Sequence, residues 1–361
     1  MRIGVDAREL TGRPTGVGRY LHGLLREWSS HGNGHEFLLF AHRPLSVNVA
    51  GMDVRLLPGN GGTAWEQLTL ARAARREGLS VLFSPAYSTP LWTSVPRVVA
   101  LHDVSFAARP EWYAGREGFR RRLLARRSIV ASRAIITISE FSKQEIVRLF
   151  GAAPADVRVV PPGIDRPIAA APASAEPDAA KPRSLSVLYV GSIFARRHIP
   201  DLIRAFERVA ARQRDAVLHL VGDNRSFPFE DLAQLIAGSA AASQIVWHRY
   251  VSEGELQQLY ANARAFAFLS EYEGLGLTPL EALSVGVPPL LLDTAVARES
   301  CGQSALYVPL GDIDATAREL ERLLLDEGTR NRLLASVPAT LARYDWKVAA
   351  RDTLAVLTGA A

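Results

Sequence analysis

The chain has 361 residues, of which 48% are apolar and 22% are charged, and its net charge is +5. This composition is typical of a globular protein with an ample core, and the length suggests about two domains. The single cysteine excludes an internal disulfide and fits a reducing compartment. The sequence opens on a predicted strand, without a leader peptide or an apolar run of about 18 residues, so we expect a cytoplasmic protein.

Strands and helices alternate through the first half of the sequence. Predicted strands occupy residues 2–6, 36–41, 53–57, 81–84, 97–101, 134–138 and 157–160. Helices are expected from about residue 19, over 65–77 and 110–133, and after residue 139. This alternation predicts a parallel sheet with right-handed crossovers. In the first loop, Gly16 and Gly18 would let the backbone approach a diphosphate closely, although an ordinary turn explains two glycines as well.

His102 and Asp103 directly follow the predicted strand of residues 97–101. In open α/β sheets, ligands bind outside the carboxyl ends of the strands. A hydrogen-bonded imidazole in a structural turn would give the same sequence. The position nevertheless makes both residues candidates for an active site.

The segment from Arg116 to Arg133 is strongly basic. Residues 101–135 contain eight arginines and three acidic residues, a balance of +5. Phe119, Leu123 and Val130 form an apolar stripe on the helix expected there. Such a helix suits an anionic membrane surface or a polyphosphate acceptor, while a solvated charged face is the simpler explanation. Nucleic acid is not expected, because neither an aromatic stacking surface nor a known module accompanies the arginines.

Residues 166–183 are dominated by Ala and Pro without apolar periodicity, which predicts a linker. A second alternation follows, with strands expected over residues 185–191, 217–221, 245–247, 265–269, 290–292 and 305–308. Gly191 ends the first of these strands, and Gly222 and Val251 follow the next two. All three are candidates for a substrate-binding surface. We therefore expect domains at residues 1–166 and 185–343, joined by a linker at 167–184.

The stretch of residues 265–289 carries the strongest chemical signal. A predicted strand is followed by a glycine-containing loop and a helix, and seven residues separate the carboxylates Glu273 and Glu281. Carboxylates accept hydrogen bonds from sugar hydroxyls, and a helix N-terminus with bare glycine N–H groups receives phosphate. A capping box explains part of this pattern, with Thr278 as N-cap and Glu281 reaching back to it. On that alternative Glu281 is structural, whereas Glu273 has no capping role.

Several segments of the sequence, taken together, resemble a known family. The segments GVDARELTGRPTGVGRY, HDVSFAARPEWY, TISEFSKQEIVRLFG, VVPPGID, VGSIFARRHIPDLIRAF, YVSEGELQQLYANA and EGLGLTPLEAL follow one another in the order found in retaining glycosyltransferases of the GT-B fold and family 4. Among these, the chain is similar to bacterial mannosyltransferases of O-antigen and related polysaccharide pathways. The resemblance implies two Rossmann-like domains that face each other across a cleft, with a C-terminal helix at residues 344–361 crossing back to the first.

The resemblance also implies roles for particular residues. Gly16 and Gly18 would approach the donor diphosphate, which Arg196 and Arg197 would neutralise. Glu273 would position the sugar hydroxyls together with the backbone N–H groups of the residues that follow it, which are Gly274, Leu275, Gly276, Leu277 and Thr278. Glu281 would hold the ribose, and His102 would lie beside the reacting sugar. The family usually has Arg-Lys at 196–197 and an aromatic residue at 275, so this chain departs from it twice.

The expected activity is transfer of a hexose to a glycan or lipid-linked acceptor, with mannose from GDP-mannose as the favoured donor. The resemblance implies front-face attack with retention, and two arginines with a helix N-terminus can stabilise the leaving diphosphate without a metal or other cofactor. A nucleotide-sugar epimerase and a non-catalytic sugar-binding protein are the alternatives. A pyridoxal-phosphate phosphorylase is disfavoured, because the three lysines lie in a surface-type helix, the linker and the tail.

Overall fold

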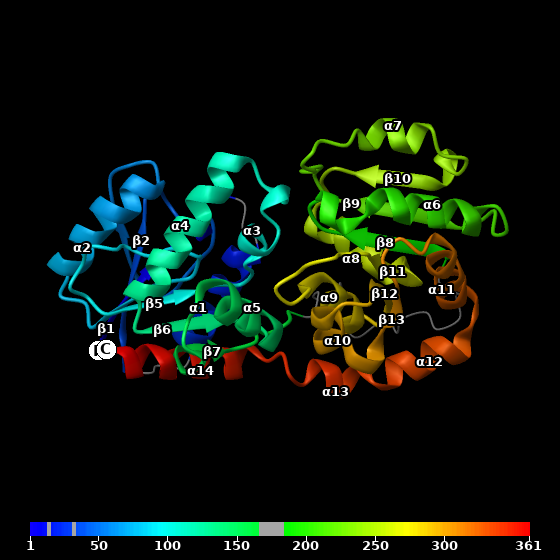
Figure 1. Ribbon diagram of the computed structural model, residues 1–361. Coiled ribbons are helices and arrows are strands. Elements are labelled where there is room, and N and C mark those ends of the chain that lie inside the picture. The colour runs from blue at the N-terminus through cyan, green and yellow to red at the C-terminus, as the bar shows by residue number, and fades with distance from the viewer. Residues whose placement is uncertain (13–15, 31–33, 166–183) are drawn as a thin grey trace. The chain divides into compact units, whose positions relative to one another are not determined.

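The computed structural model describes residues 1–12, 16–30, 34–165 and 184–361. The chain divides into two compact units (Figure 1): an N-terminal unit, Met1–Gly163 with Arg343–Ala361, and a C-terminal unit, Ile164–Ala342. The final helix therefore belongs to the N-terminal unit. The predicted linker at 167–184 lies outside the described residues apart from Ser184.

The N-terminal unit is built on a parallel sheet. Its strands are β1 (Arg2–Asp6), β2 (Glu36–Ala41), β3 (Asp53–Leu56), β4 (Val81–Ser84), β5 (Arg97–Ala100), β6 (Ala134–Thr137) and β7 (Val157–Val159). Its helices are α1 (Gly16–Ser30), α2 (Ala71–Arg76), α3 (Ser105–Ala108), α4 (Gly115–Ala131), α5 (Glu140–Phe150) and α14 (Trp346–Ala360). Shorter helical turns are η1 (Arg8–Leu10), η2 (Trp65–Leu70), η3 (Pro110–Trp112) and η4 (Pro154–Asp156), of which η2 is a π-helix.

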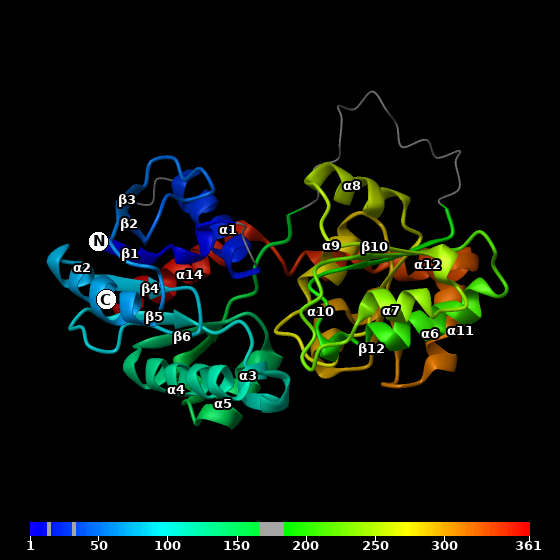
Figure 2. The ribbon, with the colours of Figure 1, turned by 90° about the horizontal axis from the view of Figure 1, so that it is seen from above.

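Helices cover both faces of this sheet (Figure 2), which is why charged residues in its central strands β1, β4 and β5 stand only at the strand ends. On one face, α4 and α5 pack on β5, β6 and β7 and share a buried core with them. On the other face lie α1 and α14, and the indole N–H of Trp28 donates to the carbonyl of Ala350 at 3.0 Å. Trp346 packs so closely on α1 that a Cβ at Gly23 would lie 2.5 Å from its ring. The C-terminal helix is thus part of the core of the N-terminal unit.

The C-terminal unit repeats the plan. Its strands are β8 (Ser186–Val190), β9 (Val217–Val221), β10 (Ile245–His248), β11 (Ala265–Phe268), β12 (Pro289–Leu292) and β13 (Leu306–Val308). Its helices are α6 (Ile199–Ala210), α7 (Leu232–Ala237), α8 (Glu253–Asn262), α9 (Leu277–Ser284), α10 (Ala295–Cys301), α11 (Ile313–Leu325), α12 (Glu327–Ala335) and α13 (Val337–Leu341). The short turns are η5 (Ala195–Arg197), η6 (Ala242–Gln244) and η7 (Gly302–Ser304).

The two sheets share one topology. Their strand orders are β3-β2-β1-β4-β5-β6-β7 and β10-β9-β8-β11-β12-β13, and every pairing is parallel. In each unit the chain winds outward from a first strand and then reverses, so the switch points lie between β1 and β4 and between β8 and β11. Ligands of doubly wound sheets bind outside the carboxyl ends of the strands at such a point. Each unit therefore offers a candidate ligand-binding edge at its own switch point.

Strand predictions agree with the structure to within one or two residues, and the doubly wound α/β class is confirmed. Helix ends differ more. The first helix begins at Gly16 rather than near residue 19, and the predicted helix over 110–133 divides into η3 and α4, because Tyr113 is extended. The short helices α3, α10 and α13 were not predicted. Over the described ranges, no helix combines the length and the apolar character needed to cross a bilayer.

Candidate active site

Two glycines shape the carboxyl end of the sheet in the C-terminal unit. Gly191 follows β8 with φ 146°, and Gly222 follows β9 with φ 147°. A Cβ at Gly222 would lie 2.0 Å from the carbonyl oxygen of Gly191, and a Cβ at Gly191 would lie 2.5 Å from Nη1 of Arg197. Glycine is favoured at both positions, since other residues rarely adopt this φ and an added Cβ would force the carbonyl of Gly191 or the guanidinium of Arg197 to shift. The space kept open at Gly191 is occupied by an arginine.

Arg197 closes the short turn η5 and reaches across the switch point. Its Nη1 donates to the carbonyl of Ser192 at 2.7 Å, while Nε and Nη2 lie 3.0 and 2.9 Å from Oε1 of Glu273. Its guanidinium also lies 4.8 Å from the ring centroid of Phe268 on β11. Burial alone would lower the pKa of Arg197, but the carboxylate of Glu273 and the neighbouring Tyr189 raise it above its ordinary value. Arg197 is thus a permanent cation committed to Glu273.

Glu273 is the first carboxylate of the predicted pair, and the structure fixes its orientation. Its Oε1 accepts from Arg197 and from the hydroxyl of Ser270, the latter at 2.7 Å. Among the described residues, none donates a hydrogen bond to its Oε2. The side chain is only 16% exposed. One oxygen is therefore anchored by the protein, and the other can accept from a hydroxyl group of a ligand.

Arg196 and His198 flank Arg197. The guanidinium of Arg196 stacks over Phe194 at 4.3 Å, and its backbone carbonyl accepts from the N–H of Glu271 at 2.9 Å. His198 has a φ of 48°, the one left-handed non-glycine residue in the described chain. Its Nε2 lies 3.3 Å from Oε2 of Glu271, and its Nδ1 lies 3.6 Å from Oδ2 of Asp201. Sequence reasoning missed His198, because neither its strained backbone nor its two carboxylate neighbours can be read from the chain order.

The helix that carries Glu281 begins earlier than the capping-box interpretation requires. Helix α9 starts at Leu277, its N-cap is Gly276 in the left-handed conformation with φ 85°, and no side chain caps it. Thr278 lies inside the first turn and cannot be the N-cap, so the capping box is wrong. The physical reason is that glycine at the turn enters the helix directly from the left-handed region. Glu281 therefore does not serve as the acid of a capping box.

The other predicted substrate-binding residues of this unit lie around the same edge. Gly274 and Leu275 are buried in the loop between β11 and α9, and Gly276 and Leu277 begin α9. Val251 is half-buried after β10, directly before Ser252, which caps α8. The structure thus brings Gly191, Arg197 and Glu273 into direct contact, while Val251 lies on the neighbouring strand connection.

In the N-terminal unit, His102 follows β5 and is held from two sides. Its Nε2 lies 2.8 Å from the carbonyl oxygen of Pro85, and its ring packs edge-on against Tyr20 at 4.5 Å. A carbonyl can only accept, so Nε2 carries the proton and Nδ1 of the neutral ring is an acceptor. Burial lowers the pKa of His102, and the Pro85 carbonyl and Asp103 offset this only in part. The imidazole is therefore neutral near pH 7 with a defined tautomer.

Asp103 accepts hydrogen bonds at the start of the neighbouring helix α3. Its Oδ1 accepts from the backbone N–H and the hydroxyl of Ser105, at 2.9 and 2.7 Å, at the start of α3. The Ser105 hydroxyl in turn lies 2.6 Å from the hydroxyl of Tyr113. These bonds give Asp103 a structural role at the turn beside its predicted contact with substrate.

Gly16 and Gly18 lie in the first turn of α1 rather than in the preceding loop. Gly16 is exposed, and a Cβ there would meet no atom within 4 Å, whereas Gly18 is buried. The helix N-terminus directs backbone N–H groups outward, which suits an anion. The backbone that was expected to approach a diphosphate at Gly16 and Gly18 therefore belongs to the first turn of a helix and not to a loop.

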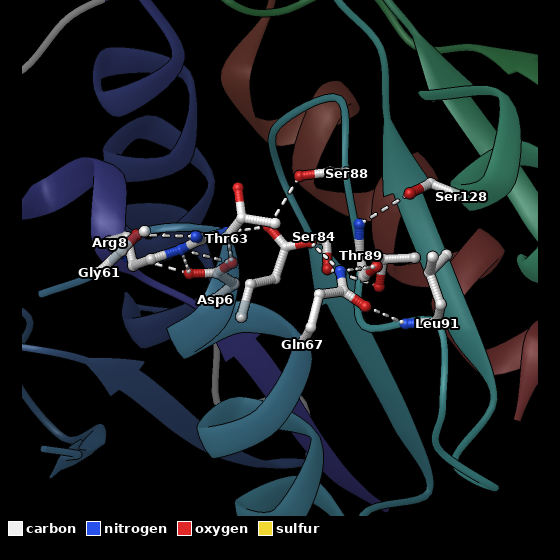
Figure 3. A network of polar contacts seen from close by, with 12 residues as sticks. Asp6, Arg8, Gly61, Thr63, Gln67, Ser84, Ser88, Thr89, Leu91 and Ser128 are labelled. Carbon is white, nitrogen blue, oxygen red and sulfur yellow. Dashed lines mark hydrogen bonds and ion pairs between the residues drawn. The ribbon is translucent and has the colours of Figure 1, made fainter. Parts of the chain in front are cut away.

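One part of this unit was not predicted at all. A polar network at the β1–β4 switch point joins Asp6, Arg8 and Glu66 (Figure 3). Nη2 of Arg8 lies 2.6 Å from both carboxylates, and the side chains of Asp6 and Glu66 are only 4% and 2% exposed. Burial would lower the pKa of Arg8, but the two carboxylates raise it above its ordinary value. The sequence offered one signal, a pair of charged residues, Asp6 and Arg8, at the end of a buried strand.

Comparison with known proteins agrees with this architecture. The model of Glycosyltransferase Family 4 matches residues 14–166, and that of Glycosyl transferases group 1 matches residues 174–336. O-antigen chain mannosyltransferase B of Escherichia coli is 29% identical over 264 residues, 71% of this chain and 68% of that protein. The GDP-mannose:cellobiosyl-diphosphopolyprenol alpha-mannosyltransferase of Xanthomonas oryzae pv. oryzae (strain PXO99A) is 28% identical over 232 residues, 62% of this chain and 58% of that protein.

Solved structures show the same fold. WaaG, a glycosyltransferase involved in lipopolysaccharide biosynthesis, superimposes with a TM-score of 0.76 at 14% identity, covering 99% of this chain and 100% of WaaG. Anabaena HepE, solved with UDP and glucose, gives a TM-score of 0.77 at 16% identity, covering 99% and 100%. The two family models divide the chain as its two sheets do. The chain belongs to the GT-B glycosyltransferases, with a family 4 domain followed by a group 1 domain.

Proposed function

We propose that the protein is a retaining, metal-independent mannosyltransferase that uses GDP-mannose and a glycan or lipid-linked acceptor. The observation that carries the proposal is the Arg197–Glu273 pair at the β8–β11 switch point, beside the start of α9. The names of two relatives, both mannosyltransferases and one specifying GDP-mannose, support the choice of donor.

In this proposal the C-terminal unit binds the nucleotide sugar. The N-terminus of α9, entered through Gly276, faces the diphosphate, because free N–H groups and the helix dipole stabilise negative charge there. Glu273 accepts from a sugar hydroxyl through Oε2, and Glu281, which no capping box engages, holds the ribose. Arg196 supplies positive charge to the diphosphate, and Arg197 supports Glu273. The two arginines thus have different tasks.

The reaction requires charge stabilisation at the leaving group. The bond between the anomeric carbon and the phosphate oxygen breaks, the acceptor oxygen bonds to the same face of that carbon, and the acceptor proton passes to the departing phosphate oxygen. Preorganised cations and N–H groups stabilise the developing negative charge, typically worth about 100- to 1000-fold in rate for one donor. In the N-terminal unit, Nδ1 of the neutral His102 ring can accept from a hydroxyl group of a ligand.

The exposed face of α4 supports a second element of the proposal, contact with an anionic membrane surface. Phe119, Leu123 and Val130 are 62%, 44% and 81% exposed. Their spacing of four and seven residues places them on one side of the helix. Exposed arginines on this helix are Arg116, Arg120, Arg126 and Arg127. An apolar stripe beside arginines suits the headgroup region of anionic lipids.

A panel of nucleotide sugars tests the donor assignment. GDP-mannose should raise the melting temperature most and should be hydrolysed slowly without an acceptor. Nuclear magnetic resonance of the transferred product should show the anomeric configuration of the donor, and turnover should persist in excess chelator. Preference for another donor, inversion, or a strict requirement for a divalent ion would each reject the corresponding part of the proposal. Release of an epimerised sugar would favour an epimerase instead.

A further inference from the structure

The buried polar network of the N-terminal unit does not end at Arg8. Glu66 and Gln67 lie in the π-helix η2, and Gln67 Nε2 donates to Glu66 Oε1 at 2.7 Å. Single-turn π-helices are often found near functional sites. From these two residues, hydrogen bonds continue to the loop of residues 85–89, which follows β4 (Figure 3).

This loop is held almost entirely by buried side chains. The Ser88 hydroxyl donates to Glu66 Oε2 at 2.7 Å, and Gln67 Nε2 donates to the carbonyl of Thr89 at 3.0 Å. The hydroxyl of Ser84 donates to that of Thr89 at 2.9 Å, and the N–H of Thr89 donates to the hydroxyl of Ser128 at 3.0 Å. Buried hydrogen bonds of this kind hold a backbone segment in a single conformation. Breaking any of them leaves a buried polar group without a hydrogen-bond partner, which costs free energy.

The first residue of the same loop is Pro85, whose carbonyl accepts the Nε2 proton of His102. Proline has no N–H, so this residue offers only the acceptor. The position of that one oxygen decides which nitrogen of His102 is protonated. Hydrogen bonds therefore connect Asp6 at the end of β1 through Arg8 and Glu66 to Ser88. Ser88 lies in the loop that begins with Pro85, whose carbonyl fixes the tautomer of His102.

We infer that the Asp6–Arg8–Glu66 network and Ser88 are positioning residues that hold the loop of residues 85–89 so that His102 keeps its proton on Nε2. Arg8 is required because Asp6 and Glu66 would otherwise repel each other while buried. Nothing in the network needs to touch substrate: four of the five donors on Arg8 are already engaged, by Asp6, Glu66 and the carbonyl of Gly61. Its consequence for catalysis rests on the function proposed above, but its consequence for His102 does not.

Nitrogen-15 spectroscopy of the full-length protein, labelled at histidine, tests the inference directly. The ring signals of His102 are assigned by their loss in His102→Gln. In the wild-type protein they should have the pattern of a neutral ring protonated at Nε2. Ser88→Ala, which removes one hydroxyl, and Glu66→Gln, which weakens the bond to Arg8, should each introduce the Nδ1-protonated form. Ser46→Ala is the matched control, since it also removes one hydroxyl, and that hydroxyl donates to the carbonyl of Leu10 rather than to Glu66.

An unchanged His102 spectrum in both Ser88→Ala and Glu66→Gln would overturn the inference. If the proposed function holds, Ser88→Ala should also lower kcat by about tenfold with little change in the KM for the donor, because a small misplacement of a catalytic group affects the reacting complex more than binding. Failure to find any transfer activity would refute the proposed function alone, and the spectra would still decide the role of the network.

Discussion

The guanidinium of Arg197 lies 2.9 Å from the carboxylate of Glu273, although the two residues are 76 positions apart in the chain. Removing one partner of a buried ion pair typically costs about 3–5 kcal/mol, because the remaining charge is left without compensation. We expect Arg197→Ala and Glu273→Gln each to lower kcat/KM by about 100-fold or more. The double variant should be little worse than either single variant, since the pair acts as a unit.

A double-mutant cycle on kcat/KM measures this coupling. Arg298→Ala is the matched control, because Arg298 pairs with Asp293 at 2.8 Å in the same unit but both side chains are about half exposed. Exposed pairs of that kind contribute about 0–1 kcal/mol. Multiplicative losses in the Arg197 and Glu273 variants would contradict the assignment.

Glu281→Gln should separate binding from folding. Since α9 begins at Leu277 without a side-chain cap, this variant removes no capping bond, and we expect it to cost less stability than the loss of a helix cap. Binding of GDP, measured by calorimetry, should weaken because a ribose contact is lost. Asp312→Ala provides the comparison, because Asp312 caps α11 through the N–H of Ala315 at 2.8 Å, and its loss should cost about 1 kcal/mol. Destabilisation of Glu281→Gln as large as this would restore a structural role.

Gly191→Ala should displace Arg197. The added Cβ would lie 2.5 Å from Nη1 of Arg197 in a backbone conformation, φ 146°, that alanine rarely adopts. We expect a lower melting temperature and a transfer rate close to that of Arg197→Ala. Gly311→Ala carries a similar conformational penalty at φ 76° but meets no atom within 4 Å, so it should lose stability without losing activity. Equal activity in the two alanine variants would refute the steric role of Gly191.

The buried His102 predicts a pH dependence of stability. Its pKa lies below the ordinary value of about 6.5, so the unfolded chain takes up a proton at a pH where the folded protein does not. The contribution of His102 is therefore fully present above about pH 6.5 and is lost as the pH falls below that value. We expect the wild-type protein to lose more stability than His102→Gln between about pH 7 and pH 5, measured by urea unfolding. Parallel pH profiles would show that the ring is not held neutral.

The exposed stripe of α4 gives a prediction about membranes. The variant Phe119→Ser/Val130→Ser should bind anionic vesicles several-fold more weakly than the wild-type protein, since two exposed apolar side chains are removed. Val348→Ser is the control, because Val348 is an exposed apolar residue of α14, 43% accessible. Vesicle sedimentation at two salt concentrations measures the effect. Equal binding to neutral and anionic vesicles would exclude a role for the arginines.

The sequence by itself determined the fold class, most strand bounds and the identity of Glu273 and Arg196–Arg197 as candidates. Buried parallel strands consist of nearly continuous apolar runs, which local composition reveals. A parallel sheet places the carboxyl ends of its strands at one edge, so the residues at that edge follow from the chain order. The family resemblance added roles to residues that already stood at strand ends.

Tertiary structure decided the rest. The contact of Arg197 with Glu273, the neutral tautomer of His102 and the ion cluster of Arg8 depend on atoms brought together from distant strands, which no local pattern encodes. The start of α9 was predicted wrongly because Thr278 and Glu281 satisfy a capping rule locally, while the left-handed Gly276 brings the chain into the helix two residues earlier than that rule allows. Local propensity favours certain residues as a helix start, but the backbone path required by the sheet determines where the helix begins.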